Sequence, residues 1–207
     1  WIYPPQEGRY KPWKGTPFMG DWDWLLEEDG IALEEGRREG EISRIGFPQY
    51  SQYGVTENPF GDGDVASCAE GWLENVSKDE PFCMYVGTLG PHDPYFVPQQ
   101  YLDLYPDESI VLPESWKDRM LDKPNLYRRT RERFDQLGEA EQKRSLKHYL
   151  AFCSYEDALF GRLLDVLERR ELLEDTVILY VSDHGDYAGA HGLWTKGLPC
   201  FKEAYHI

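Results

Sequence analysis

Asp183 and His184 lie where the sequence changes abruptly from apolar to ionisable residues. They follow the run TVILYV, residues 176–181, and precede Gly185, which permits a tight backbone turn. A carboxylate and an imidazole can together bind a hard or borderline divalent cation, and a cation beside an oxyanion neutralises developing charge. The pair therefore indicates a metal site, whereas a turn in which Asp183 caps the following backbone explains the same residues without a metal.

Lys196 and His92 could act on an anion held near such a site. Lys196, which precedes Gly197, could reach the anion as a positive point charge, although most lysines only face solvent. His92 lies between Pro91 and Pro94, which restrict its backbone, and an imidazole titrates near neutral pH, as a general acid must. A loop histidine satisfied by backbone groups is the alternative interpretation of His92.

For the other polar residues of interest we predict structural or solvent-exposed positions. We predict that Asp186 forms a turn or a cap, and that His191 anchors a loop by hydrogen bonds. Asp157 lies on an apolar helical stripe, where a local hydrogen bond is the expected role. Arg37 and Arg38 belong to the charged run GRREGE and are predicted to face solvent.

Two apolar runs are predicted to be the buried strands that position these groups. TVILYV and FCMYVGTL, residues 82–89, are short and rich in β-branched and aromatic residues, as strands buried on both faces are. Polar residues follow each run, and ligands of open α/β sheets bind beyond the carboxyl ends of the strands. We therefore expect His92, Asp183 and His184 to meet at one edge of the sheet.

Helices are predicted beside these strands. Apolar residues recur every three or four positions over residues 64–77, with Asp64 as N-cap, and over residues 139–170, the longest helix. Shorter helical stretches are expected at 99–105 and 128–134. A strand, a helical crossover and a second strand are typical of an α/β fold with a mixed, mostly parallel sheet flanked by helices.

Composition narrows the classes of function. The 207 residues carry a net charge of -16, which disfavours a nucleic-acid partner because phosphates need a basic surface. No apolar run approaches the roughly 20 residues that span a bilayer. The four cysteines show no C-x-x-C pair and are predicted to be buried free thiols, which leaves the compartment open. The oligomeric state is open as well.

Three blocks together resemble the type I sulfatases of the alkaline phosphatase-like superfamily. They are TVILYVSDHGDYAGAHGLWTKG, FCMYVGTLGPHDPYFVPQQY and HYLAFCSYEDALFGRLLDVLE. The resemblance covers residues 64–207, which it identifies as the central α/β part of a catalytic domain cut at both ends. Residues 1–63 are then a loop-rich, aromatic segment of that domain.

The resemblance implies roles for four residues. Asp183 matches the metal-binding Asp, and His184 matches its neighbour, which is Asn in many arylsulfatases and His in other members, including phosphonate monoester hydrolases. Lys196 matches the lysine that contacts the sulfate and the ester oxygen. His92 matches the histidine on the leaving-group side. The implied metal is calcium, with Mg²⁺ or Mn²⁺ as alternatives, and the implied substrate is a small-molecule or carbohydrate sulfate ester.

The sequence also departs from the family pattern. The family's Asp-Asp metal pair is absent, as is the C/S-x-P-x-R motif whose Cys or Ser becomes the formylglycine nucleophile. We therefore expect these 207 residues alone to bind metal weakly and to turn over no substrate. For the parent protein we expect sulfate ester hydrolysis. His184 leaves a phosphonate monoester or phosphodiester hydrolase open, and a non-catalytic binding protein that retains the fold is a third alternative.

Overall fold

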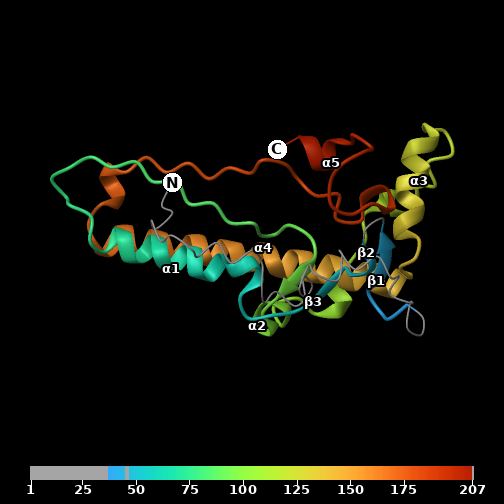
Figure 1. Ribbon diagram of the computed structural model, residues 1–207, viewed down its shortest axis with the longest axis horizontal. Coiled ribbons are helices and arrows are strands. Elements are labelled where there is room, and N and C mark those ends of the chain that lie inside the picture. Colours follow the sequence, from blue (N-terminus) through green and yellow to red (C-terminus); the bar gives the residue numbers. More distant parts are fainter. Residues whose placement is uncertain (1–36, 45–46, 207) are drawn as a thin grey trace, which may run out of the picture.

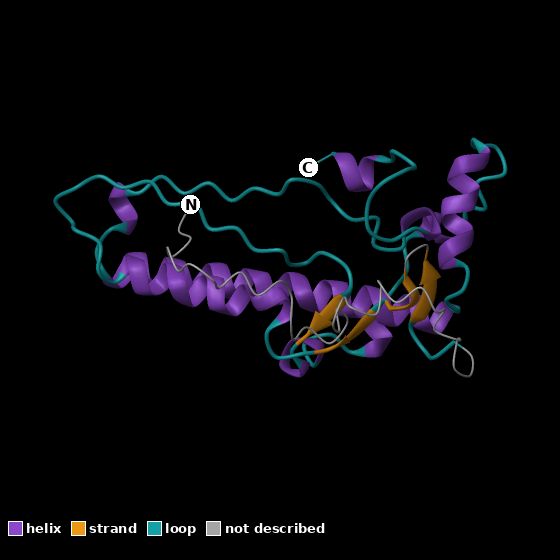
Figure 2. Cartoon of the chain, viewed as in Figure 1, coloured by secondary structure: helices purple, strands orange, loops and turns teal. Residues whose placement is uncertain are grey.

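The computed structural model describes residues 37–44 and 47–206, and a single long helix, α4 (Glu139–Arg169), forms its axis (Figure 1). Helix α1 (Asp62–Leu73) lies alongside one half of it, as Figure 2 also shows. The shorter helices are α2 (Gln99–Leu102), α3 (Asn125–Phe134) and α5 (Lys202–Tyr205). The 3-10 turns of the described residues are η2 (Pro59–Gly61), η3 (Asp107–Ser109), η4 (Glu114–Lys117), η5 (Leu173–Asp175) and η6 (Ala190–Gly192).

The predicted helices are confirmed, but two details of them are wrong. Helix α1 begins at Asp62 with Gly61 as N-cap, so Asp64 is an exposed residue of the first turn. On α4 the buried stripe is displaced by one residue from the predicted one, so that Glu156 is buried while Asp157 is exposed. The periodicity alone could not show which row of α4 faces the core, because apolar residues occupy two adjacent rows of this helix.

The start of α4 is fixed by Glu141. Its Oε2 accepts a hydrogen bond from the Gly138 N–H at 2.8 Å, and its Oε1 forms an ion pair with Arg37 at 2.6 Å. The bond from Arg37 lowers the pKa of Glu141 to about 2, despite partial burial. Arg37 therefore ties the described N-terminal residues to α4 rather than only facing solvent.

The two predicted strands do not form as strands in the part of the chain that the structure describes. Residues 82–89 and 176–181 are extended, but no strand pairs with either (Figure 2). The sheets that do form are β1 (Glu41–Arg44) with β2 (Phe47–Ser51), antiparallel, and β3 (Tyr53–Val55) with β4 (Tyr95–Val97), parallel. A mostly parallel sheet is thus not present among these residues, because an extended segment needs a neighbour for its backbone hydrogen bonds.

The extended segments still lie over the long helices (Figure 1). Phe82 and Met84 pack toward the cluster of Leu73, Val166 and Leu167 between α1 and α4. One face of the segment of residues 176–181 is open to solvent, with Val177 88% exposed and Leu179 82% exposed. Both segments therefore carry apolar side chains that no described residue covers.

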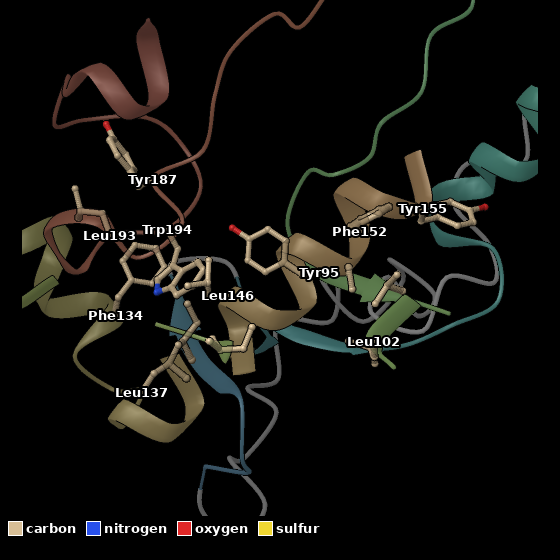
Figure 3. Close-up of a cluster of buried hydrophobic side chains, with 14 of the residues drawn as sticks. Tyr95, Leu102, Phe134, Leu137, Leu146, Phe152, Tyr155, Tyr187, Leu193 and Trp194 are labelled. Carbon is tan, nitrogen blue, oxygen red and sulfur yellow. The ribbon is translucent and has the colours of Figure 1, made fainter. Parts of the chain in front are cut away.

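The main hydrophobic core joins β4, α4 and the loop of residues 186–195, with Tyr95, Phe152 and Trp194 at its centre (Figure 3). These side chains are at most 1% exposed, and the rings of Tyr95 and Trp194 lie 5.8 Å apart. Burying aromatic rings of this size contributes more than any other residue type to such a core. The loop that carries Lys196 is thus fastened to α4 by its own apolar residues.

The four cysteines are free thiols, as predicted, but the prediction that they are buried was wrong. Cys68, Cys83 and Cys200 are exposed and Cys153 is half-buried, all as free thiols. Burial raises the pKa of the Cys153 thiol to about 11. Among the described residues, no helix combines the length and the apolar character needed to cross a membrane. Residues 1–36, which belong to the predicted loop-rich, aromatic segment, lie outside the described residues.

Candidate functional site

Lys196 brings together two of the histidines singled out in the sequence. Its ammonium Nζ lies 2.8 Å from Nε2 of His92 and 2.7 Å from Nε2 of His184. The two imidazole rings meet edge to face, with centroids 6.2 Å apart. The ends of segments 82–89 and 176–181 therefore converge on one cation, as the predicted strand ends were expected to converge.

The hydrogen bonds assign both imidazoles the same tautomer. Nδ1 of His92 lies 2.6 Å from the Asp93 carbonyl oxygen, and Nδ1 of His184 lies 2.8 Å from the Gly185 carbonyl oxygen. Because a carbonyl oxygen only accepts, each Nδ1 carries the hydrogen, and each Nε2 is left as an acceptor for the lysine. Lys196 thus donates two of its three N–H groups to neutral rings and keeps a third for a ligand.

His92 is held from behind by a buried carboxylate. Asp93 has a side chain only 6% exposed, with Oδ1 3.2 Å from Nδ1 of His92, and its Oδ2 accepts a hydrogen bond from the Tyr50 hydroxyl. Tyr50 comes from β2, so a residue far away in the sequence fixes the ring that the two prolines only restrict. The partner of Asp93 could not be identified from the sequence, because nothing in the spacing links β2 to the His92 loop.

The loop that carries Lys196 is organised around Asp186. Its Oδ1 accepts the Ala188 and Thr195 N–H groups at 2.8 and 3.0 Å, and its Oδ2 accepts the Tyr95 hydroxyl at 2.7 Å. Loss of water around the carboxylate raises the pKa of Asp186 to about 6, although these bonds act in the opposite direction. The turn role predicted for Asp186 fits these contacts. Tyr95 is the residue that sequence reasoning missed.

Gly197 is fixed by two tyrosines. Its carbonyl oxygen accepts the Tyr187 hydroxyl at 2.8 Å and the Tyr205 hydroxyl at 3.0 Å. The backbone on both sides of Lys196 is therefore restrained, while the lysine side chain itself is exposed. Such an arrangement presents a charge in a defined place at little cost in loop entropy.

The described residues do not form a metal site by themselves. Asp183 is 89% exposed in its side chain and lies 3.5 Å from Nε2 of His184, whose lone pair already accepts from Lys196. No group of three or more His, Cys, Asp or Glu side chains in residues 37–44 and 47–206 is placed to hold a metal ion. Calcium prefers six to eight oxygen ligands, and Asp183 supplies only one carboxylate.

His191 anchors its loop, in keeping with the prediction. Nδ1 lies 3.1 Å from Oδ2 of Asp118, its N–H reaches Oγ of Ser115 at 3.2 Å, and its ring stacks on Phe201 with centroids 4.0 Å apart. These contacts join η6 to η4 and to the segment before α5. The ring therefore points to structural groups and not to Lys196.

We expect His191→Ala to lower the free energy of unfolding by about 1–2 kcal/mol, because the stacking and one charge-assisted hydrogen bond are lost. Thermal unfolding followed by circular dichroism measures this change. His206→Ala, at an exposed position near the end of the chain, is the matched control. Equal melting temperatures for the two variants would contradict the anchoring role.

Comparison with known proteins gives the family. The sulfatase family model matches residues 42–207. The chain is 35% identical to a choline-sulfatase of Rhizobium meliloti over 153 residues, 69% of this chain and 30% of that protein. It is 34% identical to human iduronate 2-sulfatase over 157 residues (69% and 28%), and 29% identical to an ulvan-active sulfatase of Formosa agariphila over 194 residues (92% and 31%).

These matches cover most of this chain but only part of each relative. The chain spans about a third of the length of the curated relatives it matches. The match includes the helices, both extended segments and the Lys196 loop, which together carry the site described above. The chain belongs to the sulfatase family.

Proposed function

We propose that the protein containing this chain hydrolyses sulfate esters, and that Lys196 and His92 act on the ester. The observation that carries the proposal is the ammonium held between two neutral imidazole nitrogens, with a third N–H that no described residue accepts and that can bind a sulfate oxygen. In a chain with a net charge of -16, an anionic ester needs such a local positive charge. The three relatives described above are all named as sulfatases, which supports the same reaction.

Each residue has a distinct part in this proposal. The Lys196 ammonium offsets negative charge that develops on the bridging oxygen as the S–O bond breaks. His92 and His184 orient the ammonium. Lys196 gives its third proton to the departing alkoxide oxygen, and His92 assists by passing a proton from solvent through Nε2 back to the lysine amine. The family resemblance implies a formylglycine nucleophile, and these 207 residues contain no C/S-x-P-x-R motif that could supply it.

We also propose that Asp183 and His184 contribute to a divalent-cation site, with calcium as the first candidate. The remaining oxygen ligands would come from outside the described residues. With the metal bound, His184 would hold it in place of Lys196, and His92 alone would orient the ammonium. The measurement is thermal unfolding of the full-length protein with and without Ca²⁺. Stabilisation that persists in Asp183→Asn would argue against this ligand.

We infer that residues 82–89 and 176–181, which are extended but unpaired among the described residues, become strands of a mostly parallel sheet in the full-length protein. Support comes from the alternation of half-buried Phe82, Met84 and Val86 with exposed residues between them, which has the period of a strand. The polar residues that follow both segments would then lie at the carboxyl edge of that sheet.

The test of the proposed function is an assay of the full-length protein on an aryl sulfate and on a phosphonate monoester. We expect the sulfate to be the better substrate, and a higher rate on the phosphonate would favour the alternative reaction. Anion binding without turnover of either compound would favour a binding protein.

We expect His92→Gln to reduce kcat for the aryl sulfate by about 10²-fold, because the glutamine amide can hydrogen-bond to Lys196 but cannot exchange a proton with it. The reduction should be smaller for a sulfate ester whose alcohol is a good leaving group. Steady-state kinetics on two such esters measures it, with His206→Gln as the control. An equal loss on both esters would contradict a role in leaving-group departure.

A further inference from the structure

Two buried carboxyl groups lie beneath the turn that carries His92. Asp62 of α1 is 2% exposed and Glu156 of α4 is 5% exposed, and both lie against Gly90, because Asp62 accepts the Gly90 N–H at 2.8 Å and a Cβ atom on Gly90 would overlap Oε1 of Glu156. A carboxylate can only accept a hydrogen bond, so a bond between two carboxyl groups requires one proton between them. No described residue donates a hydrogen bond to the buried Oε1 of Glu156, which would be costly if this group were ionised.

The pair is in direct contact with the backbone that leads to His92. Asp62 accepts the Leu89 N–H at 3.0 Å through Oδ1 and the Gly90 N–H at 2.8 Å through Oδ2. A Cβ atom on Gly90 would overlap Oε1 of Glu156, so the turn lies directly against this side chain. The His92 N–H in turn donates to the Leu89 carbonyl oxygen at 3.1 Å, which continues the turn to the imidazole.

We propose that Asp62 and Glu156 share one proton and, through the turn of residues 89–92, act as positioning residues that aim His92 at Lys196. Loss of the shared proton would leave two negative charges in contact within a buried site. Their repulsion would displace the side chains that hold the Leu89 and Gly90 N–H groups. The inference rests on the proposed function only where it concerns activity, because the shared proton and the orientation of His92 can be measured without substrate.

The groups that face Glu156 do not titrate in the same range. Burial raises the pKa of Tyr155 to about 12 and that of Cys153 to about 11, and burial also raises the pKa of Tyr180 on the neighbouring extended segment. These groups therefore stay neutral between pH 5 and about 9. Burial first, and the charge of Asp62 second, raise the pKa of Glu156 to about 8, while burial also raises the pKa of Asp62. Asp157 is the adjacent charged residue, and it faces solvent.

The raised pKa of Glu156 makes the folded protein less stable as pH rises. Between the ordinary glutamate value of 4.5 and about 8, the folded protein binds a proton that the unfolded chain has released. Stability is therefore lost as pH rises through this window, and the loss is complete above about pH 8. Glu156→Gln keeps a hydrogen-bond donor for Asp62 at every pH and so fixes the singly protonated arrangement.

The first measurement is the melting temperature of the full-length wild type, Glu156→Gln and Asp157→Asn between pH 5 and pH 9. We expect the difference in melting temperature between Glu156→Gln and the wild type to grow by at least about 3 °C, in favour of the variant, from pH 5 to pH 9. Asp157→Asn, one residue further on at an exposed position, should run parallel to the wild type. Parallel curves for all three proteins would overturn the shared proton.

The second measurement follows the His92 ring by NMR in protein labelled at histidine, with the resonance assigned from its absence in His92→Gln. In the wild type the resonance should shift between pH 7 and pH 9, and in Glu156→Gln this shift should be lost. A shift of equal size in both proteins would overturn the positioning role, even if the melting curves supported the shared proton. The kcat of the wild type should decline above about pH 8 and that of Glu156→Gln should not. A wild type without sulfatase activity would refute the proposed function and leave the NMR result to decide this inference.

Discussion

Lys196→Met is expected to lower kcat/KM for a sulfate ester by about 10²–10³-fold, a larger loss of activity than any other single substitution in the site should cause. Methionine has a similar length but no charge, so the sulfate loses its cation and the two imidazole Nε2 atoms lose their common donor. Steady-state kinetics of the full-length protein measures the change. Because the lysine side chain is exposed, the melting temperature should change little.

Two further variants sharpen this prediction. Lys202→Met changes an exposed lysine on α5 and should retain wild-type kinetics. Lys196→Arg keeps the charge but replaces a compact ammonium by a planar fork, which cannot donate to both imidazoles in the same geometry, so only partial activity is expected. Wild-type kcat/KM in Lys196→Met would refute the assignment of this lysine to the ester.

Trp194→Ala is expected to cost about 3–5 kcal/mol of the free energy of unfolding, the largest effect on stability. The indole is 1% exposed, lies against Tyr95, and donates its N–H to the side chain of Gln142 on α4. Its removal leaves a cavity and an unsatisfied amide oxygen at the joint between the Lys196 loop and the long helix. Denaturant unfolding monitored by circular dichroism gives the value.

Trp116→Ala is the matched control for this change. Trp116 lies on η4 and is only half-buried, so its removal should cost well under half as much. We also expect Trp194→Ala to reduce kcat more than Trp116→Ala does, because the indole packs next to the turn that restrains Lys196. Equal losses of stability in the two variants would contradict the central position of Trp194.

The helices could be predicted because they depend on local patterns. The convergence of the site could be predicted because polar residues follow two apolar runs whose ends were expected to meet at one edge of a sheet. The apolar residues of the long helix repeat with the helical period, and His92 and His184 each follow closely after an apolar run. The roles of these residues as ligands or catalysts stay predictions. Residues 1–36, 45–46 and 207 lie outside the described part of the chain, so expectations about the aromatic N-terminal segment also stay predictions.

The incorrect predictions concern residues whose burial or hydrogen-bond partners depend on long-range contacts. Phe152 and Leu159 lie on one row of α4 and face the described core, while Phe160, on the adjacent row, contacts Tyr180 of the extended segment at 4.9 Å between ring centroids. Periodicity detects both rows but cannot rank them, which is why Asp157 was assigned to the buried stripe and Glu156 was overlooked. The hydrogen bonds from Tyr50 and Tyr95 to buried carboxylates were likewise invisible, because each joins residues more than 40 positions apart.

The open extended segment 176–181 has a consequence for handling these 207 residues in isolation. TVILYV combines β-branched and aromatic residues with no charge and no proline, and the side chains of Val177, Leu179 and Val181 are at least 80% exposed. Short segments of this kind stack in register between molecules and form the dry interfaces of cross-β fibrils. The same six residues that should serve as a core strand in the complete domain would then seed self-association in a truncated one, so chaperones or solubility partners would be needed to keep it monomeric.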